Sequence, residues 1–464
     1  MDWTVAKLVE ATGGRLLQGN PDLPVTGIST DTRLMQPGSC FVALPGERYD
    51  GHRFIMDALA RNATAFIISS ARPEGCLPAP DKVSVIEVQD TLYALGKLAG
   101  YWRRQHLIPV VGITGSNGKT STKEMVGAIL SVRHRVLKNE GNFNNLIGVP
   151  LTLLSLQPHH EVAVVEMGIN VPGEMARLVE MSDPTVGLIT NIYPAHLEGL
   201  HSMEQILQEK SKLWMALKEG ALAVVNRDDE RLVRVAGTLK ARTITYSLQD
   251  PSARVKLAGE VEMREGWTTF PLLLGTERIS VRLPVLGLHQ VQNAIAAAAV
   301  AWGMGESPET VARGLSSYQP VKQRMQMHHL RDGRVVIDDS YNANPGSTFA
   351  AVQAACTASA GKPLVVVLGE MRELGPESAR LHWELGQKIA ALGVARLITL
   401  GEMGKEIVRG AEEGGMPAAA CHHAQDHEEI LDFLKANRVA NEWVLVKGSR
   451  AMAMERVVEG ILAE

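Results

Sequence analysis

The residues best suited to chemistry in this chain form one glycine-rich run between an apolar stretch and a helix-like pattern. The run and its flank read Thr114, Gly115, Ser116, Asn117, Gly118, Lys119, Thr120 and Ser121. Glycines let the backbone approach an anion closely, and a helix N-terminus adds the positive end of its dipole. Lys119 can reach the outer phosphates of a nucleotide, and the Thr120 hydroxyl suits Mg²⁺. The run therefore predicts a phosphate-binding loop, although the longer form of the pattern would need glycine where Ile113 stands.

Other candidate residues follow the apolar runs that predict buried strands. Glu166 comes directly after the run 162–165, where a carboxylate in the same domain as a phosphate loop is suited to Mg²⁺. His196 lies shortly after the run 186–190, and a lone histidine in such a place is by itself a weak signal. Lys210 lies in a helical pattern where its residue type alone indicates a solvated surface lysine.

A polar segment also follows the apolar run 335–337. It spans 338–345 and contains two aspartates, two asparagines and a proline, a composition typical of a ligand edge and also of a plain turn. Arg324 lies upstream of it, and the segment 447–450 after the last apolar run could hold another anion.

The elements that must position these residues indicate an α/β protein of three domains. We expect a small α/β domain over 1–100, a central parallel-sheet domain with the phosphate loop over 101–315, and a doubly wound, Rossmann-like domain over 316–464. The strand-like runs are 40–44, 65–68, 107–113, 162–165, 186–190, 221–225, 335–337, 364–368, 397–400 and 444–446. Helices are predicted over 91–105 and within 283–302, and a loop over 71–81.

Composition excludes several classes of protein. The chain has 464 residues, 45% of them hydrophobic, and a formal net charge of −4 with no dominant basic segment, which argues against a nucleic-acid partner. Its four cysteines are far apart and lack metal-ligand spacing. The N-terminus does not have the pattern of a signal peptide, and no apolar stretch is long enough to span a bilayer, so a cytoplasmic location is expected.

Taken together, the motifs resemble those of the Mur ligases over essentially the whole chain. The first segment carries the series 29–33, 37–38, 41–44 and 46–52, which resembles a uridine-nucleotide domain, and the middle carries the TGSNGKT loop, the segments 142–150 and 166–168, and His196 and Lys210 spaced 14 apart. The third-segment motifs 339–345, 368–375 and 446–450 resemble the members that add D-alanyl-D-alanine. One departure is Gln290, where the family usually has asparagine after His289; Asn293 is retained.

The resemblance implies a set of site residues. Lys119, His196 and Lys210 would be catalytic, with Lys210 carbamylated, and Thr120, Glu166, His196 and Lys210 would hold Mg²⁺. Asn293, Arg324 and Asp339 would join the phosphate loop in binding ATP. Ser29, Thr30, Arg33, Asn144 and Asn145 would contact the UDP-linked substrate.

The implied activity is ATP-dependent ligation of D-alanyl-D-alanine to UDP-N-acetylmuramoyl-tripeptide through an acyl phosphate. A monomer is expected, and the site is expected to assemble when the domains close. The alternatives are a diamino-acid-adding ligase, a folylpolyglutamate synthetase and a P-loop regulatory NTPase. The third-segment motifs oppose the first, and the uridine-type first segment opposes the second. The second complete α/β domain, with its polar strand ends, opposes the third.

Overall fold

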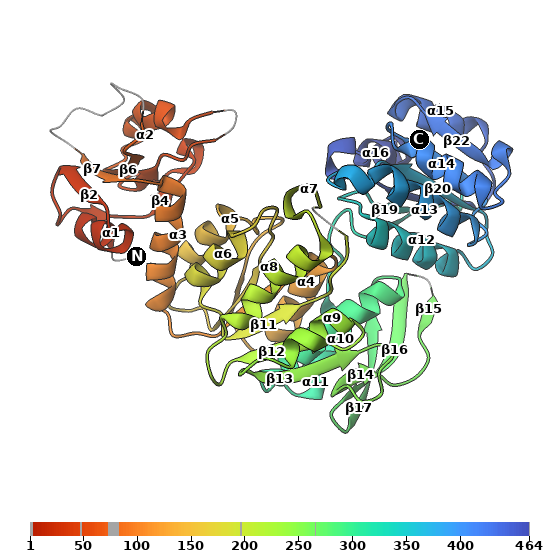
Figure 1. Cartoon of the computed structure of the whole chain (residues 1–464), viewed down its shortest axis with the longest axis horizontal. Coiled ribbons are helices and arrows are strands. Elements are labelled where there is room, and N and C mark those ends of the chain that lie inside the picture. Colours follow the sequence, from red (N-terminus) through yellow and green to blue (C-terminus); the bar gives the residue numbers. More distant parts are fainter. Residues whose placement is uncertain (1–2, 47–48, 73–82, 195–196, 265, 464) are drawn as a thin grey trace. The chain divides into compact units, whose positions relative to one another are not determined.

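A computed structural model describes residues 3–46, 49–72, 83–194, 197–264 and 266–463. The chain forms two compact units (Figure 1). The first contains residues 1–112, 134–169 and 173–185, and the second contains 113–133, 170–172 and 186–464. The chain therefore passes between the units several times, and each unit is described by itself.

The first unit contains a five-stranded sheet in the order β2-β7-β6-β5-β4, parallel except for β2. These strands are β2 (Arg15–Gln18), β4 (Ile28–Ser29), β5 (Cys40–Val42), β6 (Ala65–Ser69) and β7 (Ser84–Val88). The predicted strands at 40–44 and 65–68 are confirmed, and most of the predicted loop 71–81 lies outside the described residues. A separate pair is β1 (Trp3–Thr4) with β3 (Pro24–Val25), and the helices are α1 (Val5–Thr12) and α2 (Ile55–Ala60).

The first unit also contains β10 (Val162–Glu166) and its parallel neighbour β9 (Val136–Lys138). Its further helices are α3 (Thr91–Arg104), α5 (Gly148–Leu154) and α6 (Glu174–Ser182), and α3 packs on both α5 and α6. The helix predicted over 91–105 is thus confirmed. The buried Arg103 donates to the backbone carbonyls of Ser182 and Asp183 at 3.0 and 3.3 Å, which fixes the end of α3 to the end of α6.

The second unit begins within β8 (Val110–Thr114) and continues into α4 (Lys119–Leu130). Its first sheet has a parallel part, β11 (Val186–Ile189), β12 (Leu222–Asn226), β13 (Arg242–Ser247) and β14 (Val255–Leu257). An antiparallel part continues it: β16 (Trp267–Leu274) pairs with β14, β15 (Glu262–Arg264) and β17 (Glu277–Leu283). The helices of this part are α7 (Leu197–Leu200), α8 (Met203–Met215), α9 (Glu230–Ala236), α10 (Leu288–Gly303) and α11 (Pro308–Ser317).

The antiparallel extension was not predicted, because its strands are only half buried. Along β16 every second residue is buried, from Thr268 to Leu274, which is the alternation of a strand with one face covered. Helices α10 and α11 pack on this part of the sheet and provide that cover (Figure 1). The alanine-rich helix predicted within 283–302 is α10.

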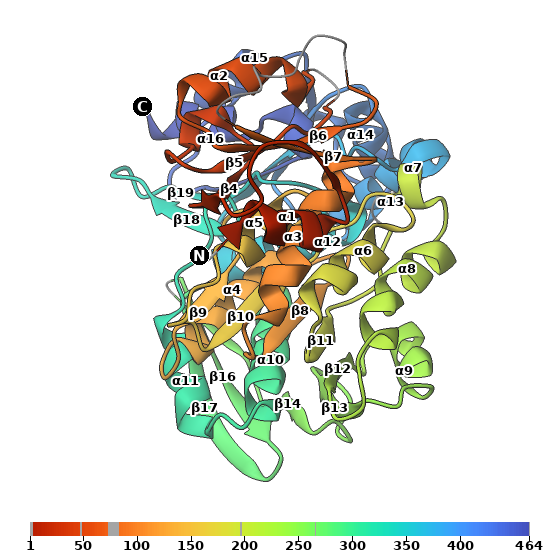
Figure 2. The ribbon, with the colours of Figure 1, turned by 90° about the vertical axis from the view of Figure 1, so that its left-hand side faces the viewer.

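The C-terminal sheet has the order β18-β19-β23-β20-β21-β22 and is parallel except for β18. Strand β18 lies next to β19 at one edge (Figure 2). Its strands are β18 (Gln326–His329), β19 (Val335–Asp339), β20 (Leu364–Gly369), β21 (Arg396–Leu400), β22 (Cys421–Ala424) and β23 (Trp443–Lys447). Its helices are α12 (Pro345–Ser359), α13 (Ser378–Ala390), α14 (Gly404–Glu413), α15 (His427–Ala436) and α16 (Glu455–Leu462).

This sheet is buried on both faces. Val335 and Ile337 belong to a core shared with α12, α13 and α14, whereas Val336 belongs to a second core shared with α15 and α16. The predicted doubly wound domain and its four apolar strands are therefore confirmed. Among the described helices, none is long and apolar enough to cross a membrane.

Candidate active site

The glycine-rich loop requires glycine at two positions. Gly118 has φ of 79°, and a Cβ there would lie 2.2 Å from Asn293 Oδ1. Gly115 has φ of 145°, and a Cβ there would lie 1.9 Å from Thr190 Oγ1. Both positions therefore exclude any side chain, because the backbone conformation and the space available both require its absence.

The loop is fixed by the segment that follows β11. The backbone N–H of Ser116 donates to Asn191 O at 3.0 Å, and that of Asn117 donates to Asn191 Oδ1 at 2.9 Å. Thr190 Oγ1 donates to Asn117 O at 2.6 Å, and Ser116 Oγ donates to Tyr193 O at 2.8 Å. Sequence reasoning considered only His196 here, although the position of 190–193 at a strand end was a usable signal. His196 itself lies outside the described residues.

Lys119 and Thr120 begin α4, as expected of the phosphate loop. The Lys119 ammonium donates to the backbone oxygens of Gly115 and Ser116 at 2.9 and 3.2 Å, so it lies over the loop itself. The buried Thr120 hydroxyl accepts from Arg324 Nη2 at 3.1 Å, across 204 positions of sequence. Arg324 also stacks its guanidinium 4.2 Å from the ring centroid of Tyr341. Thr114 and Ser121 are buried on either side of the loop.

Asn293 lies on α10 against the phosphate loop and is buried. Its Nδ2 donates to Gln290 Oε1 at 3.2 Å, and Gln290 is also buried. Gln290 thus fixes the orientation of the Asn293 amide. His289 beside it is neutral at physiological pH, because burial lowers its pKa to about 4, against the attraction of Asp339.

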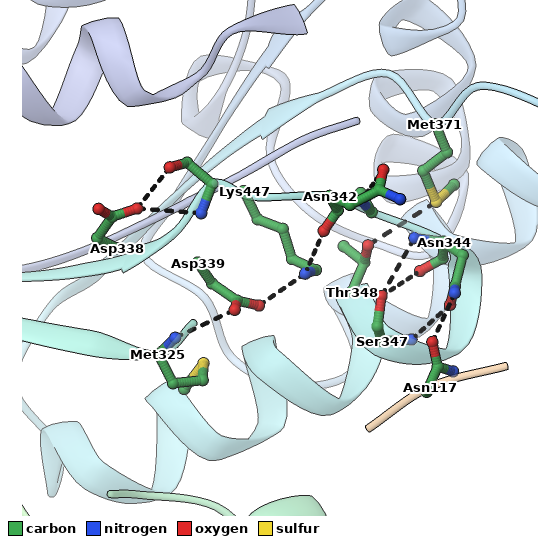
Figure 3. Close-up of polar contacts among 12 residues, drawn as sticks. Asn117, Met325, Asp338, Asp339, Asn342, Asn344, Ser347, Thr348, Met371 and Lys447 are labelled. Carbon is green, nitrogen blue, oxygen red and sulfur yellow. Dashed lines mark hydrogen bonds and ion pairs between the residues drawn. The ribbon is translucent and has the colours of Figure 1, made fainter. Parts of the chain in front are cut away.

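The polar segment after β19 is tied to the last strand of the same sheet (Figure 3). Lys447 Nζ donates to Asp339 Oδ2 at 2.6 Å and to Asn342 O at 2.8 Å. The other oxygen of Asp339 accepts from the backbone N–H of Met325 at 3.1 Å, next to Arg324. Asp338 instead accepts from Ser340, and burial raises its pKa. Lys447, offered by sequence as a possible anion-binding residue, is therefore engaged by a carboxylate.

Asn344 connects this segment to the phosphate loop. It caps α12 by accepting from Ser347 N at 2.9 Å, and its Nδ2 donates to Asn117 Oδ1 at 2.6 Å (Figure 3). Both contacts fall within the second unit. Sequence reasoning identified the polar segment but assigned Asn344 no partner, because no local pattern reveals a contact with Asn117.

The position of Lys210 shows that the interpretation from its residue type alone, a solvated surface lysine, was wrong. It is on α8 with 1% of its surface exposed, so it is not a solvated lysine. Burial and, second, the positive charge of Lys119 hold the pKa of Lys210 well below its usual range. Lys212, two positions along the same helix, has a side chain that is 36% exposed and pairs with Glu209.

Glu166 belongs to the first unit and is 1% exposed. Asn139 holds its backbone with hydrogen bonds of 2.9 and 3.1 Å, and Asn144 Nδ2 donates to its Oε1 at 2.7 Å. Its Oε2 is buried without a hydrogen-bond partner among the described residues. A buried, unpartnered carboxylate oxygen fits a hard cation such as Mg²⁺, which takes oxygen ligands. No group of three or more His, Cys, Asp or Glu side chains in the described ranges could hold a metal unaided.

The residues predicted to contact the UDP-linked substrate are all in the first unit. Ser29 Oγ donates to Asp31 O at 2.9 Å and orders the turn that Thr30 occupies. The Arg33 side chain is 82% exposed and pairs with Asp31, whose pKa it lowers. Asn145 differs from Asn144, since its Oδ1 accepts from Gly148 N at 2.9 Å and caps α5.

Three family models match consecutive parts of the chain. They are "Mur ligase family, catalytic domain" over residues 24–103, "Mur ligase middle domain" over 113–301 and "Mur ligase, glutamate ligase domain" over 323–450. A UDP-N-acetylmuramoyl-tripeptide--D-alanyl-D-alanine ligase from Escherichia coli is 35% identical over 99% of this chain and 98% of its own. The chain belongs to the Mur ligase family. A ligase of the same name from Bacillus subtilis is 34% identical over the same shares.

Solved Mur ligase structures agree over the full length. A MurF crystal structure from Acinetobacter baumannii has a TM-score of 0.91 and 31% identity, covering 100% of this chain and 99% of its own. MurF from Thermotoga maritima, solved in complex with ADP, has a TM-score of 0.84 and 28% identity, covering 94% of this chain and 97% of its own. The three Mur ligase domains expected from the motifs are therefore present.

Proposed function

We propose that this Mur ligase joins D-alanyl-D-alanine to UDP-N-acetylmuramoyl-tripeptide at the expense of ATP. The observation that carries the proposal is the match over 99% of the chain to curated ligases of that name. The geometry supports it, because Arg324 of the third segment reaches the hydroxyl of Thr120 in the phosphate loop. A nucleotide bound at that loop would contact residues from two of the family's domains.

ATP is proposed to bind at the phosphate loop, from Thr114 to Ser121. The backbone N–H groups and the Lys119 ammonium would face its phosphates, and Asn293 would lie near the adenine. Arg324 would add a second positively charged side chain, after Lys119, to the ATP site. Asp339 would be the acidic residue of the ATP site. Lys447 and the backbone N–H of Met325 hold its carboxylate in place next to Arg324.

Mg²⁺ is proposed as a second requirement, and it would supply charge neutralisation on the phosphates. Thr120 and Glu166 are the proposed ligands of one ion, and His196, Glu166 and a carbamylated Lys210 those of another. The buried Glu166 Oε2, which has no hydrogen-bond partner in the described ranges, supports the first assignment. The lowered pKa of Lys210 supports the second, because CO₂ adds only to a neutral amine.

The proposed reaction has two steps. An oxygen of the tripeptide carboxylate attacks the γ-phosphorus of ATP, so that ADP leaves and an acyl phosphate forms. The amine of D-alanyl-D-alanine then attacks the acyl carbon, and phosphate leaves as the amide forms. Lys119 and Arg324 offset negative charge on the phosphates during the first step.

The UDP-linked substrate is proposed to contact Ser29, Thr30, Arg33, Asn144 and Asn145. Since Asn144 also donates to Glu166, it would link the substrate to the metal site. We place the reaction in the cytoplasm, because its substrates are nucleotides, and expect a monomer.

The proposal is tested by measuring phosphate release from ATP with each acceptor alone and with both. Release that requires UDP-N-acetylmuramoyl-tripeptide and D-alanyl-D-alanine together is the expected result. Release that needs neither would indicate a regulatory NTPase. Release with a diamino acid or a folylpolyglutamate acceptor would indicate another amide ligase.

A further inference from the structure

A small cavity lies between helices α3 and α6 in the first unit. Its volume is about 20 Å³, and its polar lining consists of Tyr93, Lys97, Arg104, Arg177 and Glu180. A water molecule needs roughly 10–15 Å³ of such space, so the cavity has room for one small group. None of these residues belongs to the phosphate loop or to the proposed substrate contacts.

Two glycines fix the position of this cavity. A Cβ at Gly96 would lie 3.0 Å from Met181 Cε, and one at Gly100 would lie 3.3 Å from Met181 Cα. Because glycine has no Cβ at either position, α6 can approach α3 closely. The lining side chains therefore project from two helices held by backbone packing and by the Arg103 bonds to the end of α6.

The cavity carries excess positive charge. Lys97, Arg104 and Arg177 are cations, and Glu180 is the single acid among the lining residues. Glu180 Oε1 is already paired with Lys97 Nζ at 2.7 Å. The Tyr93 ring lies 5.2 Å from Lys97 Nζ and 5.5 Å from Arg177 Cζ, and its π-face offsets part of that charge.

Two nitrogens of Arg177 have no hydrogen-bond partner among the described residues, and an anion would supply one. Its Nε and Nη2 are both buried, and neither has a hydrogen-bond partner within the described part of the chain. These two nitrogens form one edge of the guanidinium, the fork that matches two oxygens of a carboxylate or phosphate. Charged donors left unpaired in the interior are costly, which makes the free fork evidence for a ligand.

We propose that this cavity is an oxyanion site, in which two oxygens of one phosphate or carboxylate group accept from Arg177 Nε and Nη2. Lys97 and Arg104 supply the remaining charge. The size of the cavity limits the bound part to one anionic group. That group is either a free ion such as inorganic phosphate or the exposed end of a larger molecule.

The proposal is tested by calorimetric titration with inorganic phosphate at constant ionic strength. The full chain carries Lys119→Ala, which weakens binding at the phosphate loop. Saturable binding is expected to remain in this background and to weaken at least about tenfold when Arg177→Gln is added, since two charge-assisted hydrogen bonds are lost. Arg15→Gln is the matched control, because Arg15 is a 74% exposed arginine of the same unit, and it should leave binding unchanged.

Acetate and phenyl phosphate distinguish the sources of the group. Binding of inorganic phosphate or acetate assigns a free ion, and binding of phenyl phosphate alone assigns the end of a larger molecule. No saturable binding of any probe, or equal binding in the Arg177→Gln variant, would overturn the proposal.

A stability measurement separates this role from a structural one. Without an anion Arg177→Gln should leave the thermal midpoint unchanged or raise it, because it removes an unpaired buried charge. It should also abolish the rise in midpoint that phosphate causes. Arg177→Lys, which keeps the charge but lacks the fork, should also abolish this phosphate-induced rise and serves if the glutamine variant does not fold. A phosphate-dependent rise that persists in both variants would also contradict the assignment.

Discussion

Lys210 and Lys212 are two positions apart on α8, yet only the first is buried. A carbamylated Lys210 would supply an anion to the metal site, so Lys210→Ala should fold normally and lose most of its ligase activity. Added acetate should partly restore turnover by filling the vacated space. Lys212→Ala is the control and should cost under about half a kcal/mol of stability with little loss of activity. Full activity in Lys210→Ala, or equal damage in both variants, would contradict the assignment.

A residue's role could be predicted from the sequence where its partners lie close to it along the chain. The phosphate loop is one contiguous run, and its conformation follows from its glycines. The contact of Arg324 with Thr120 joins residues 204 positions apart and was not predicted, although the family resemblance implied that Arg324 belongs to the ATP site. The burial of Lys210 was invisible for the same reason, because distant segments cover it.

At the scale of elements, the turn into α4 can be tested with a pair of glycines. Gly118 and Gly220 have φ values of 79° and 83°, but only Gly118 has close neighbours for a Cβ. Both Gly→Ala variants should therefore lose about 1 kcal/mol or more of stability from backbone strain. Gly118→Ala alone should also weaken ATP binding at least about tenfold, since it displaces Asn293. Equal ATP affinity in the two variants, measured by calorimetry, would show that the contact with Asn293 is unimportant.

At the start of α12, two substitutions of Asn344 separate its role as the helix cap from its hydrogen bond to Asn117. Asn344→Ala removes both the helix cap and the bond to Asn117, and should cost about 1 kcal/mol of stability together with activity. Asn344→Asp keeps the cap but cannot donate to Asn117 Oδ1. It should therefore retain its stability while kcat/KM for ATP falls severalfold. Thermal unfolding and initial rates measure the two effects, and an aspartate variant with wild-type rates would exclude a role for this bond.

The strands were predictable from the sequence where helices cover both faces of their sheet. Continuous apolar runs marked β20 and β23, because helices cover both faces of the C-terminal sheet. The antiparallel strands β15, β16 and β17 were missed, since a half-buried strand such as β16 buries only alternate residues, Thr268 among them, and includes Pro271. The Arg177 nitrogens that have no hydrogen-bond partner in the described part of the chain were equally hidden from sequence, because their surroundings depend on how α6 packs on α3.

At the scale of the whole molecule, several histidines link stability to pH. Burial lowers the pKa of His160, His289, His382 and His423, and for His289 the value is about 4. The unfolded chain binds these protons near pH 6.5 and the folded chain binds them only at lower pH, so their contribution to stability is present above pH 6.5 and is lost as the pH falls, for His289 down to about pH 4.

The thermal midpoint should therefore decrease steadily between pH 7 and pH 5. His289→Gln should make that decrease shallower by removing one of the linked groups. His329→Gln, at an exposed position on β18, is the control and should follow the wild-type curve. An identical pH profile in all three proteins would show that His289 does not contribute to the pH dependence of the thermal midpoint.

The order of strands in the C-terminal sheet has a consequence for synthesis on the ribosome. β23 is the last strand to be translated, yet it lies between β19 and β20 in the middle of the sheet. A nascent chain that ends before residue 443 has no central strand, and the facing edges of β19 and β20 remain open to other chains. This sheet therefore stays unfinished until β23 (Trp443–Lys447) has been translated, and a stop codon just before residue 443 would leave a chain prone to aggregate.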